Sequence, residues 1–558
     1  GRIDFDYMEQ LTGFERNKIV DDLHGDIFPV PELSTENNTV YQTSDEYLSG
    51  NIYKKIAQAE AKISENPEYA DNIAALTEVI PKPLKATEID MQLGMTWIDT
   101  KIIQQFMYEL FETPTRFKEY DSNVAQENPN AITVSYLGSG KGSWKIKNAR
   151  LDNSLKSTKN FGTKDYNAYE LLEKILNAKS VAVTETVSDP VTGSKKTIIL
   201  EKETKAAEDK VKQINAAFKK WIFADPERRN ELVKTYNEKF NGIRPREYDG
   251  SHLNFFGSNP EITLKPHQKN AVAHALFGGN TLFAHQVGAG KTFEMIATAM
   301  EGKRLGLHNK SMFVVPNHLT EQIGSDFMKL YPNANILVAK ADDFSPQKRR
   351  QMCARIATGN FDAVIIGHSQ LIKIPLSSKR EEEFIRNQIN EVMAALDAAN
   401  ETGSKSYTIK QLEAIKDKLR DRLEKLTNGT VKDNAVTFEE LGVDKLFVDE
   451  AHEFKNLYVS TKMENVSGLS TNADVQKTQD LYMKCQYLDE KTNSKGVVFS
   501  TGTPVTNALS EMYTTMKYLQ SDLLKETGLN SFDAWAGNFT RKSTEAEISP
   551  SGSDWRMK

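Results

Sequence analysis

The segment AHQVGAGKTFE, residues 284–294, holds two glycines, a lysine and a threonine directly after a short apolar run. Gly288 and Gly290 allow a sharp bend, and bare backbone amides that open a helix attract an anion. Lys291 supplies a positive charge for the β and γ phosphates of a nucleotide, and Thr292 supplies a hydroxyl for Mg²⁺. We therefore predict a loop that binds the phosphates of ATP, made of Gly288, Ala289, Gly290, Lys291 and Thr292.

This loop departs from the strict pattern G-x-x-x-x-G-K-[ST], because His285 stands at the position of the first glycine. A glycine turn that binds nothing is the alternative interpretation of the segment. A second segment, GSGKGS at 138–143, also combines glycines with a lysine. It lacks a hydroxyl after Lys141, and alternating strand residues follow it. We interpret this second segment as a hairpin turn.

Two adjacent acids end another apolar run, in KLFVDEAHEFKN at residues 445–456. In a nucleotide-hydrolysing site, the first carboxylate holds Mg²⁺ and the second orients and deprotonates the attacking water. We therefore predict Asp449 as a Mg²⁺ ligand and Glu450 as the general base. His452 is a candidate relay between the γ-phosphate region and a neighbouring strand. The alternatives are an acidic strand end that faces solvent and a structural histidine.

A third motif, VVFSTGTPVTN at residues 497–507, also follows an apolar run. Thr501, Gly502 and Thr503 place two hydroxyls and a flexible backbone where this run ends. These groups would lie at the same sheet edge as the other two motifs, and an ordinary turn is the alternative.

The elements that must position these motifs are short apolar runs that alternate with helical stretches after residue 260, as in a parallel sheet with helices on both faces. The runs are TLFAH, SMFVVP, NILVA, FDAVIIG, KLFVDE and GVVFSTG. Two highly charged helical stretches within 377–428 interrupt this alternation, and we predict an inserted helical hairpin there. The resulting α/β lobe over 251–540 places the ends of its strands, and thus the motifs, along one sheet edge.

The residues before the lobe have a different character. Residues 1–130 are predicted to be mostly helical, with helical periods at 45–62, 67–80 and 88–111 and a break at Gly94. Residues 131–250 predict an α+β region with hairpins at 131–147 and 180–200. Helices are expected there at 168–177, 204–223 and 226–240. Residues 541–558 are expected to form a polar tail.

The composition limits the classes of protein that fit. The chain has 558 residues, is 39% hydrophobic and carries a formal net charge of -6. It is therefore not a polycation that coats nucleic acid, and any contact with nucleic acid must come from a local basic stripe. No apolar run has the length needed to cross a bilayer, so no membrane contact is expected.

Cys353 and Cys485 are the two cysteines and have no metal-ligand spacing, which predicts reduced thiols and a cytoplasmic protein. The chain opens on Gly1 without an initiator methionine and stops after a polar stretch. We interpret it as a piece cut from a longer protein.

Taken together, the motifs resemble a known family. LKPHQ (264–268), HQVGAGKT (285–292), FVVPNHL (313–319), VDEAH (448–452) and STGTPVTN (500–507) occur in the order found in superfamily-two helicases. The set is similar to the first RecA-like lobe of the Swi/Snf-type branch, and Gly-Thr-Pro-x-x-Asn is a specific marker of that branch. The resemblance covers about residues 260–520. In that branch, an acid usually stands where this chain has His285.

The resemblance implies roles for further residues. Gln268 would read the adenine base, and Thr501 and Thr503 would couple the state of the nucleotide to nucleic acid. The segments PNHL and GHSQ would follow the phosphates of a nucleic-acid strand, and their implied contact residues are Pro316, Asn317, His318, His368 and Ser369.

The first 250 residues resemble the region ahead of the helicase lobe in large phage and conjugative-element proteins, which often carry a DNA adenine methylase. No methylase signature is visible in this sequence. Such motors need a second RecA-like lobe that brings an arginine to the γ-phosphate. We expect that lobe, and any methylase domain, elsewhere in the full-length chain, and slow ATP hydrolysis by this piece alone.

The leading hypothesis is therefore a fragment of an ATP-dependent DNA translocase or helicase that binds Mg-ATP and moves on duplex DNA. The first alternative is a restriction-type motor or an RNA helicase with the same lobe. The second is a non-enzymatic, nucleotide-gated docking module.

Overall fold

The computed structural model describes most of the chain, which folds into two compact units. The first unit comprises residues 1–92 and 217–248, and the second comprises 93–216 and 249–558. The boundaries predicted at 130, 250 and 540 remain a proposal. The residues outside the description are 1–2, 36–37, 120–127, 139–141, 189–194, 402–405, 429–435, 462, 464–465, 467, 470–475, 541–545, 549–554 and 558.

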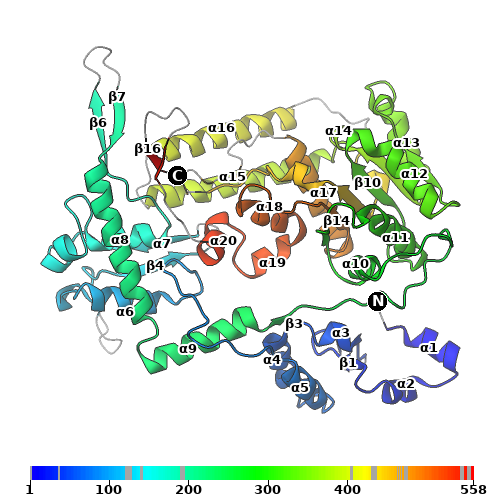
Figure 1. Ribbon diagram of the computed structural model, residues 1–558, viewed down its shortest axis with the longest axis horizontal. Helices are drawn as coiled ribbons and strands as arrows, with labels where there is room; N and C mark the ends of the chain where they lie inside the picture. The colour runs from blue at the N-terminus through cyan, green and yellow to red at the C-terminus, as the bar shows by residue number, and fades with distance from the viewer. Residues whose placement is uncertain are drawn as a thin grey trace. The chain divides into compact units, whose positions relative to one another are not determined.

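The second unit is built on a six-stranded parallel sheet (Figure 1). The strand order is β11-β12-β10-β13-β14-β9, and all six predicted runs form strands of this sheet. The strands are β9 (Thr281–Phe283), β10 (Ser311–Val315), β11 (Ile336–Val338), β12 (Ala363–Gly367), β13 (Lys445–Asp449) and β14 (Val497–Ser500). Every residue of β10, β12, β13 and β14 is buried, as expected for a parallel sheet covered on both faces. The parallel sheet confirms the predicted α/β lobe.

Alternating residues of each strand pack on opposite faces of the sheet. Met312, Val314 and Val448 join one large core that also includes residues of helices α13 (Arg349–Thr358) and α17 (Gln476–Thr492). Phe313 points the other way, stacks on Phe447 with 4.6 Å between ring centroids, and meets Phe327 of α12 (Thr320–Leu330) edge-on. Helices α10 (Pro266–Phe277) and α11 (Lys291–Arg304) flank β9 in the sequence. Both cysteines are buried and free.

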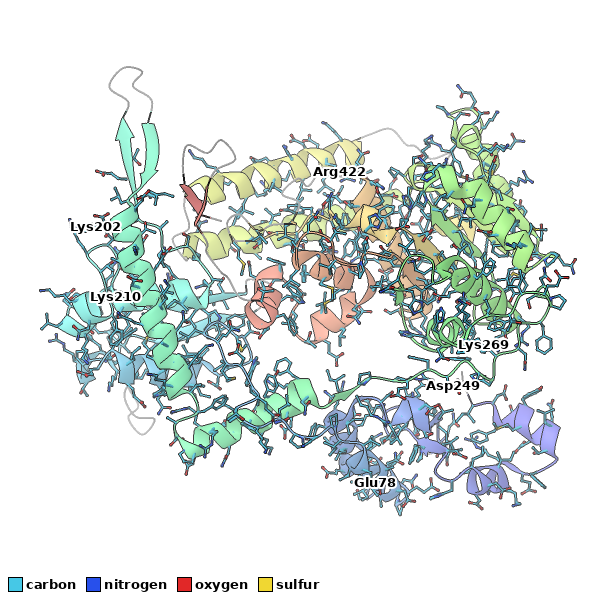
Figure 2. The ribbon with its side chains drawn as sticks, in the orientation of Figure 1. Glu78, Lys202, Lys210, Asp249, Lys269 and Arg422 are labelled. Atoms are coloured by element: carbon cyan, nitrogen blue, oxygen red, sulfur yellow. The ribbon has the colours of Figure 1, made fainter. Side chains whose placement is uncertain are left out.

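The predicted insertion is a hairpin of two long helices, α15 (Ser378–Glu401) and α16 (Ser406–Asn428). Apolar residues of the two helices form a core of their own. Arg422, labelled in Figure 2, ties the hairpin to the lobe. Its guanidinium donates to Glu381 Oε1 at 2.8 Å and to Gln479 Oε1 of α17 at 2.9 Å. The predicted break between the helices falls largely on 402–405, which lie outside the described residues.

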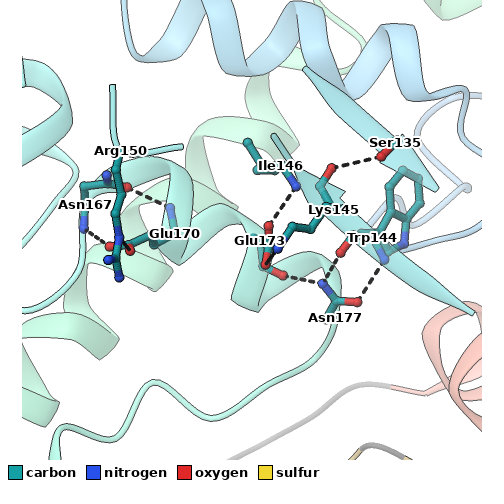
Figure 3. A network of polar contacts seen from close by, with 9 residues as sticks. All are labelled: Ser135, Trp144, Lys145, Ile146, Arg150, Asn167, Glu170, Glu173 and Asn177. Carbon is teal, nitrogen blue, oxygen red and sulfur yellow. Dashed lines mark hydrogen bonds and ion pairs between the residues drawn. The ribbon is translucent and has the colours of Figure 1, made fainter. Parts of the chain in front are cut away.

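Residues 93–216 contribute a small α+β body to the same unit. Its first hairpin joins β4 (Val134–Leu137) to β5 (Ser143–Ile146), as predicted, and the turn residues 139–141, including Lys141, lie outside the described residues. Figure 3 shows how this hairpin packs on α7 (Ala168–Leu176) and the residue after it. Trp144 exchanges two backbone hydrogen bonds with the Asn177 amide, at 2.8 and 2.9 Å, and its side chain is buried.

A second predicted hairpin pairs β6 (Thr184–Ser188) with β7 (Lys195–Ile199), and its predicted turn at 189–194 lies outside the described residues. Helix α6 (Thr100–Leu110) precedes the first hairpin and α8 (Glu201–Trp221) follows the second. The next helix, α9 (Pro226–Tyr236), begins where Asp225 accepts a hydrogen bond from the amide of Arg228 at 2.8 Å, with proline in the first turn.

The structure differs from the prediction at two segments of residues 1–98, and the second of them, 88–98, crosses from the first unit into the second. The helix expected over 45–62 is split into α3 (Ser44–Tyr47) and α4 (Ile52–Lys62), because Gly50 between them takes a φ of +77°. The helix expected over 88–98 does not form. Its apolar residues at 89, 91, 93, 95 and 98 are buried, but the chain turns at 93–94 and 96–97 and Gly94 takes a φ of +99°, which interrupts a helix.

The remaining elements of the first unit are short. They are α1 (Phe5–Thr12), α2 (Arg16–Asp22), β1 (Ile27–Pro29), β2 (Tyr41–Thr43), β3 (Gly50–Asn51), α5 (Tyr69–Glu78), a π-helix (Asn237–Asn241) and β8 (Ile243–Arg244). No helix in the described part of the chain combines the length and the apolar character that a membrane span requires.

Candidate active site

The predicted phosphate loop and the paired acids lie at the same edge of the sheet, with one strand between them. In the register of the parallel strands, Phe283 at the end of β9 is beside Ser500 at the end of β14, which is beside Asp449 at the end of β13. The backbone amide of Thr501 continues this pairing with a hydrogen bond to the carbonyl of Phe283 at 3.0 Å. Because the strands are parallel, the segments that follow all three leave the sheet on its carboxyl side.

The loop between β9 and α11 has the backbone that its glycines were expected to permit. Gly288 and Gly290 take φ angles of +86° and +92°, and Gly290 is the residue that caps α11. A side chain at position 290 would also be too close to a neighbour, because its Cβ would lie 2.3 Å from Gln268 Nε2. Lys291 opens the helix, and its ammonium donates to the carbonyls of His285 at 2.9 Å and Gln286 at 3.2 Å.

Helix α10 lies against this loop through its first turn. Gln268 is buried, and its Nε2 donates to the carbonyl of Gly290 at 3.2 Å while its Oε1 accepts from the amide of Lys265 at 2.9 Å. A side-chain amide has two N–H donors and two acceptor lone pairs. Nε2 of Gln268 therefore keeps one N–H, and Oε1 keeps one lone pair, for a further hydrogen bond. Reading of adenine by Gln268 therefore remains a prediction that this geometry permits.

The paired acids have different surroundings. Asp449 is 8% exposed, whereas the side chain of Glu450 is 37% exposed, and Glu450 takes the left-handed backbone conformation with a φ of +49°. A non-glycine residue in this conformation is strained, and such strain clusters at functional sites. His452 Nδ1 lies 3.2 Å from Glu450 Oε2 and 3.1 Å from Thr501 Oγ1. This histidine thus bridges the general-base candidate and the neighbouring strand end.

The Gly-Thr-Pro segment contacts the phosphate loop directly. A Cβ built on Gly502 would lie 2.8 Å from Val287 Cγ2 and 3.7 Å from Lys291 Nζ. The hydroxyl of Thr501 accepts a hydrogen bond from the amide of Thr503 at 3.1 Å, which closes a tight turn. The structure therefore brings together the predicted coupling residues, His452 and the phosphate loop.

Two of the residues implied in nucleic-acid contact lie together at the ends of β10 and β12. Asn317 Oδ1 accepts hydrogen bonds from the amide and the hydroxyl of Ser369, both at 3.1 Å. Pro316 and His318 flank Asn317 in the chain.

The side chain of His368 does not join this pair and instead contacts the backbone of Asp449. Its side chain is buried, and its Nε2 lies 2.9 Å from the carbonyl oxygen of Asp449. Burial lowers the pKa of His368 to about 4, so its ring is neutral near pH 7. The structure thus gives His368 a position that supports the end of β13.

The residues at this edge fit a magnesium ion. Thr292 offers a hydroxyl in the first turn of α11, and Asp449 offers a carboxylate at the end of β13. Mg²⁺ prefers oxygen ligands and is commonly held by one or two carboxylates together with phosphate oxygens and water. This donor set suits Mg²⁺ better than a softer metal.

Several residues around the site escaped the sequence prediction. Glu294 is fully buried on α11, where burial raises the pKa of its carboxyl and the hydrogen bond from His285 acts in the opposite direction. His267, one residue before Gln268, contacts the carbonyl of Ala289 at 3.1 Å. The sequence did hold one sign of the buried Glu294. This acid stands in the apolar helical stretch FEMIATAM, and an acid among apolar helix residues needs a buried partner.

A second pair that the sequence did not reveal braces the Gly-Thr-Pro segment. Lys455 Nζ lies 3.2 Å from Glu511 Oε1, and the same carboxylate accepts a hydrogen bond from the amide of Thr506 at 2.7 Å. Lys455 also donates to the hydroxyl of Thr506. These contacts link the segment after the paired acids to the one after Thr501.

The parallel sheet carries these three segments on its carboxyl edge, which is the arrangement that the resemblance to helicase- or translocase-type ATPases predicts. Residues 276–553 match the family model described as "Probable helicase domain". Residues 1–42 match "Probable helicase, winged helix domain", and 92–242 match a domain of unknown function. The match over residues 276–553 supports a helicase domain in the part of the chain where the sequence motifs predict one.

Two individual proteins are similar to this chain. The first is the "Defense against restriction protein B" of Escherichia phage P1, which is 24% identical over 560 residues. The match covers 90% of this chain and 24% of the phage protein, so the chain spans about a quarter of the length of that relative. The second is a solved structure, the Sulfolobus solfataricus SWI2/SNF2 ATPase core in complex with dsDNA. It has 15% identity and a TM-score of 0.29, and the match covers 51% of this chain and 40% of that chain.

Proposed function

We propose that this lobe binds Mg-ATP between the phosphate loop and the paired acids, and that the full-length protein hydrolyses ATP to move on duplex DNA. The observation that carries the proposal is the register of the sheet, in which the ends of β9, β14 and β13 follow one another as Phe283, Ser500 and Asp449. The phosphate loop and the two acids then face each other across the width of a single strand.

Each residue at this edge has a role that follows from its position. Lys291, 3.7 Å from the Cβ position of Gly502, neutralises the β and γ phosphates once its ammonium leaves the carbonyls of His285 and Gln286. Thr292 and Asp449 hold Mg²⁺, which neutralises charge on the phosphate oxygens. Glu450 orients and deprotonates the attacking water.

His452 is suited to report the state of this site to the next strand. Its Nδ1 is within 3.2 Å of both Glu450 Oε2 and Thr501 Oγ1, so a movement of Glu450 toward a bound water changes the contact with Thr501. Thr501, Gly502 and Thr503 would pass this change to the bound nucleic acid.

Duplex DNA is the proposed partner. The resemblance to the Swi/Snf-type branch supports this choice, and so does the winged-helix family match of residues 1–42, because winged helices commonly bind DNA. With a net charge of -6, the chain needs a local basic surface for this contact, and Pro316, Asn317, His318 and Ser369 are its proposed neighbours.

The decisive experiment measures DNA-stimulated ATP hydrolysis by the longer protein, because an arginine from a second RecA-like lobe is proposed to complete the site. We expect duplex DNA to accelerate hydrolysis, and slow hydrolysis by the 558-residue chain alone. Stimulation by RNA but not by duplex DNA would instead favour an RNA helicase.

The Glu450→Gln variant tests the site itself. We expect it to bind ATP with unchanged affinity and to lose hydrolysis by a factor on the order of 100 or more, the range that a positioned base contributes. Normal turnover by this variant would remove Glu450 as the base. The Lys291→Ala variant should lose ATP affinity, and unchanged partner binding in that variant would favour the docking module.

A further inference from the structure

Two consecutive carbonyls of the phosphate loop are held by the first turn of α10. His267 Nε2 lies 3.1 Å from the carbonyl oxygen of Ala289, and Gln268 Nε2 lies 3.2 Å from that of Gly290. A carbonyl can only accept a hydrogen bond, so Nε2 of His267 carries its hydrogen in this contact.

The His267 contact fixes the direction of the Ala289 carbonyl, whereas the Gly290 carbonyl also accepts hydrogen bonds from the amides of Phe293 at 3.0 Å and Glu294 at 3.3 Å in α11. In a trans peptide, the C=O and the following N–H point in opposite directions, and the described residues contain no cis peptide bond. The amide of Gly290 therefore points away from α10. It is among the first amides of the loop–helix junction, which have no partner within a helix and are available to an anion.

The ring of His267 itself lies beside two further residues, Glu294 and His285. Glu294 is fully buried, and its Oε1 accepts a hydrogen bond from His285 Nδ1 at 2.8 Å and lies 4.0 Å from His267 Nε2. The rings of His267 and His285 meet edge to face, with 5.5 Å between their centroids. The second carboxylate oxygen of Glu294 is buried and has no hydrogen-bond partner among the described residues. A buried carboxylate with one oxygen unsatisfied is costly, which makes a purely passive role for Glu294 a poor explanation.

We propose that His267 is a positioning residue that aims the Gly290 amide at the nucleotide phosphates, and that Glu294, through His285, holds His267 in place. This proposal rests on the proposed ATP site. Because the Ala289 carbonyl is held by α10 before any nucleotide binds, the Gly290 amide needs no reorganisation when the triphosphate arrives, which favours affinity. His285 then has a defined use in this chain: its ring links the start of the loop to the helix that follows it.

The test compares two substitutions of His267 in the 558-residue chain. His267→Phe keeps a ring against His285 but removes the donor, and His267→Gln restores an N–H of similar reach. We expect His267→Phe to weaken the binding of ATP by roughly threefold to tenfold, the effect of one lost hydrogen bond, and His267→Gln to recover most of that affinity. Pyrophosphate, used as a competitor, should lose affinity for His267→Phe in parallel with ATP, because the effect concerns the phosphates and not the base.

A melting temperature measured without nucleotide separates positioning from a structural role. We expect both variants to melt near the wild-type temperature. The proposal is overturned if His267→Phe binds ATP and pyrophosphate like the wild type, or if both variants lose affinity together with a lower melting temperature.

Two further comparisons complete the design. Adding Glu294→Gln to His267→Phe should cause less than the sum of the two separate losses in affinity, because both residues act on one loop, and full additivity would contradict this link. Lys291→Ala serves as the reference for the site. If the wild type binds no ATP, or Lys291→Ala binds it equally well, the proposed function itself fails. If Lys291→Ala loses binding and His267→Phe does not, only the positioning role fails.

Discussion

The conformation of single residues shapes the phosphate loop, and Gly290 illustrates this best. Its φ of +92° is in the left-handed region, and it lies so close to the Gln268 amide that a Cβ would be 2.3 Å from Nε2. Gly306, after α11, shares the left-handed backbone with a φ of +69° but has open space around its Cβ position. A comparison of substitutions at the two glycines therefore distinguishes the effect of backbone strain, which both share, from the effect of crowding Gln268, which only position 290 has.

We predict that Gly290→Ala abolishes measurable ATP binding, whereas Gly306→Ala leaves ATP affinity unchanged. Both substitutions carry the backbone strain of a left-handed alanine, about 1–2 kcal/mol of unfolding free energy. Gly290→Ala additionally pushes Gln268 away from the loop. Nucleotide titration and thermal melting of both variants check this, and equal ATP affinities would contradict the role given to position 290.

Lys455 and Glu511 support a prediction about how DNA stimulates ATP hydrolysis rather than about how tightly ATP binds. Their contact at 3.2 Å and the hydrogen bond from Thr506 to Glu511 hold the Gly-Thr-Pro segment against the paired acids. In the longer protein, we predict that Lys455→Met reduces the stimulation of hydrolysis by DNA while ATP affinity stays unchanged. A lower ATP affinity with intact stimulation would place Lys455 in nucleotide binding instead.

Among the elements, the two ends of the inserted hairpin leave the lobe close together, and further contacts such as that of Arg422 with Gln479 join its helices to the lobe. The amide of Phe438, just before β13, donates to the carbonyl of Pro375 at 2.8 Å, and Ser377 donates to the Glu439 carboxylate, so the two ends of the insertion meet. The hairpin also has its own apolar core. An insertion whose ends already meet can be shortened at little entropic cost to the host fold.

We therefore predict that replacing residues 378–436 with a short glycine-serine linker preserves the sheet and leaves ATP affinity unchanged. The melting temperature should fall, because the contacts of Arg422 with Glu381 and Gln479 are lost. Circular dichroism and nucleotide titration of the shortened chain check this. Loss of ATP binding in a protein that still folds would show that the hairpin takes part in the nucleotide site.

At the scale of the whole molecule, buried histidines make stability depend on pH. His308, in the loop before β10, is 7% exposed, and burial together with the charge of Lys445 lowers its pKa to about 4. In the unfolded chain its pKa is about 6.5, so between these values the unfolded state binds more protons than the folded one. The stabilisation is complete above pH 6.5 and is lost as the pH falls toward 4.

The predicted slope for His308 is about 1.4 kcal/mol of unfolding free energy per pH unit in that window. Denaturant unfolding at several pH values between 4.5 and 7 measures it. The His308→Gln variant should show a smaller slope by that amount, and His318→Gln, at an exposed position, should leave the slope unchanged. Equal slopes for the wild type and His308→Gln would mean that His308 is protonated in the folded lobe.

Local patterns in the sequence determined the six strands, the two small hairpins and the inserted helical hairpin, and they indicated the resemblance of the lobe to helicases. A parallel sheet buries its strands on both faces and therefore leaves apolar runs that can be read without a structure. The glycines of the phosphate loop and the paired acids were equally visible, because their residue types carry the chemistry. The segment 88–98 was misjudged because the chain turns at 93–94 and 96–97, with Gly94 at a φ of +99°, and a short apolar pattern does not reveal such turns.

The tertiary structure alone decided which residues surround the predicted ones. The Glu294–His285 pair spans nine residues, His267 and Ala289 are 22 apart, and the His368–Asp449 contact joins residues 81 apart in the chain. Such contacts depend on strand order and on the packing of α10 against the loop, which involve the whole sheet. A local pattern records the residue types that chemistry needs, whereas their partners are chosen by long-range packing, and that is why only the folded chain reveals them.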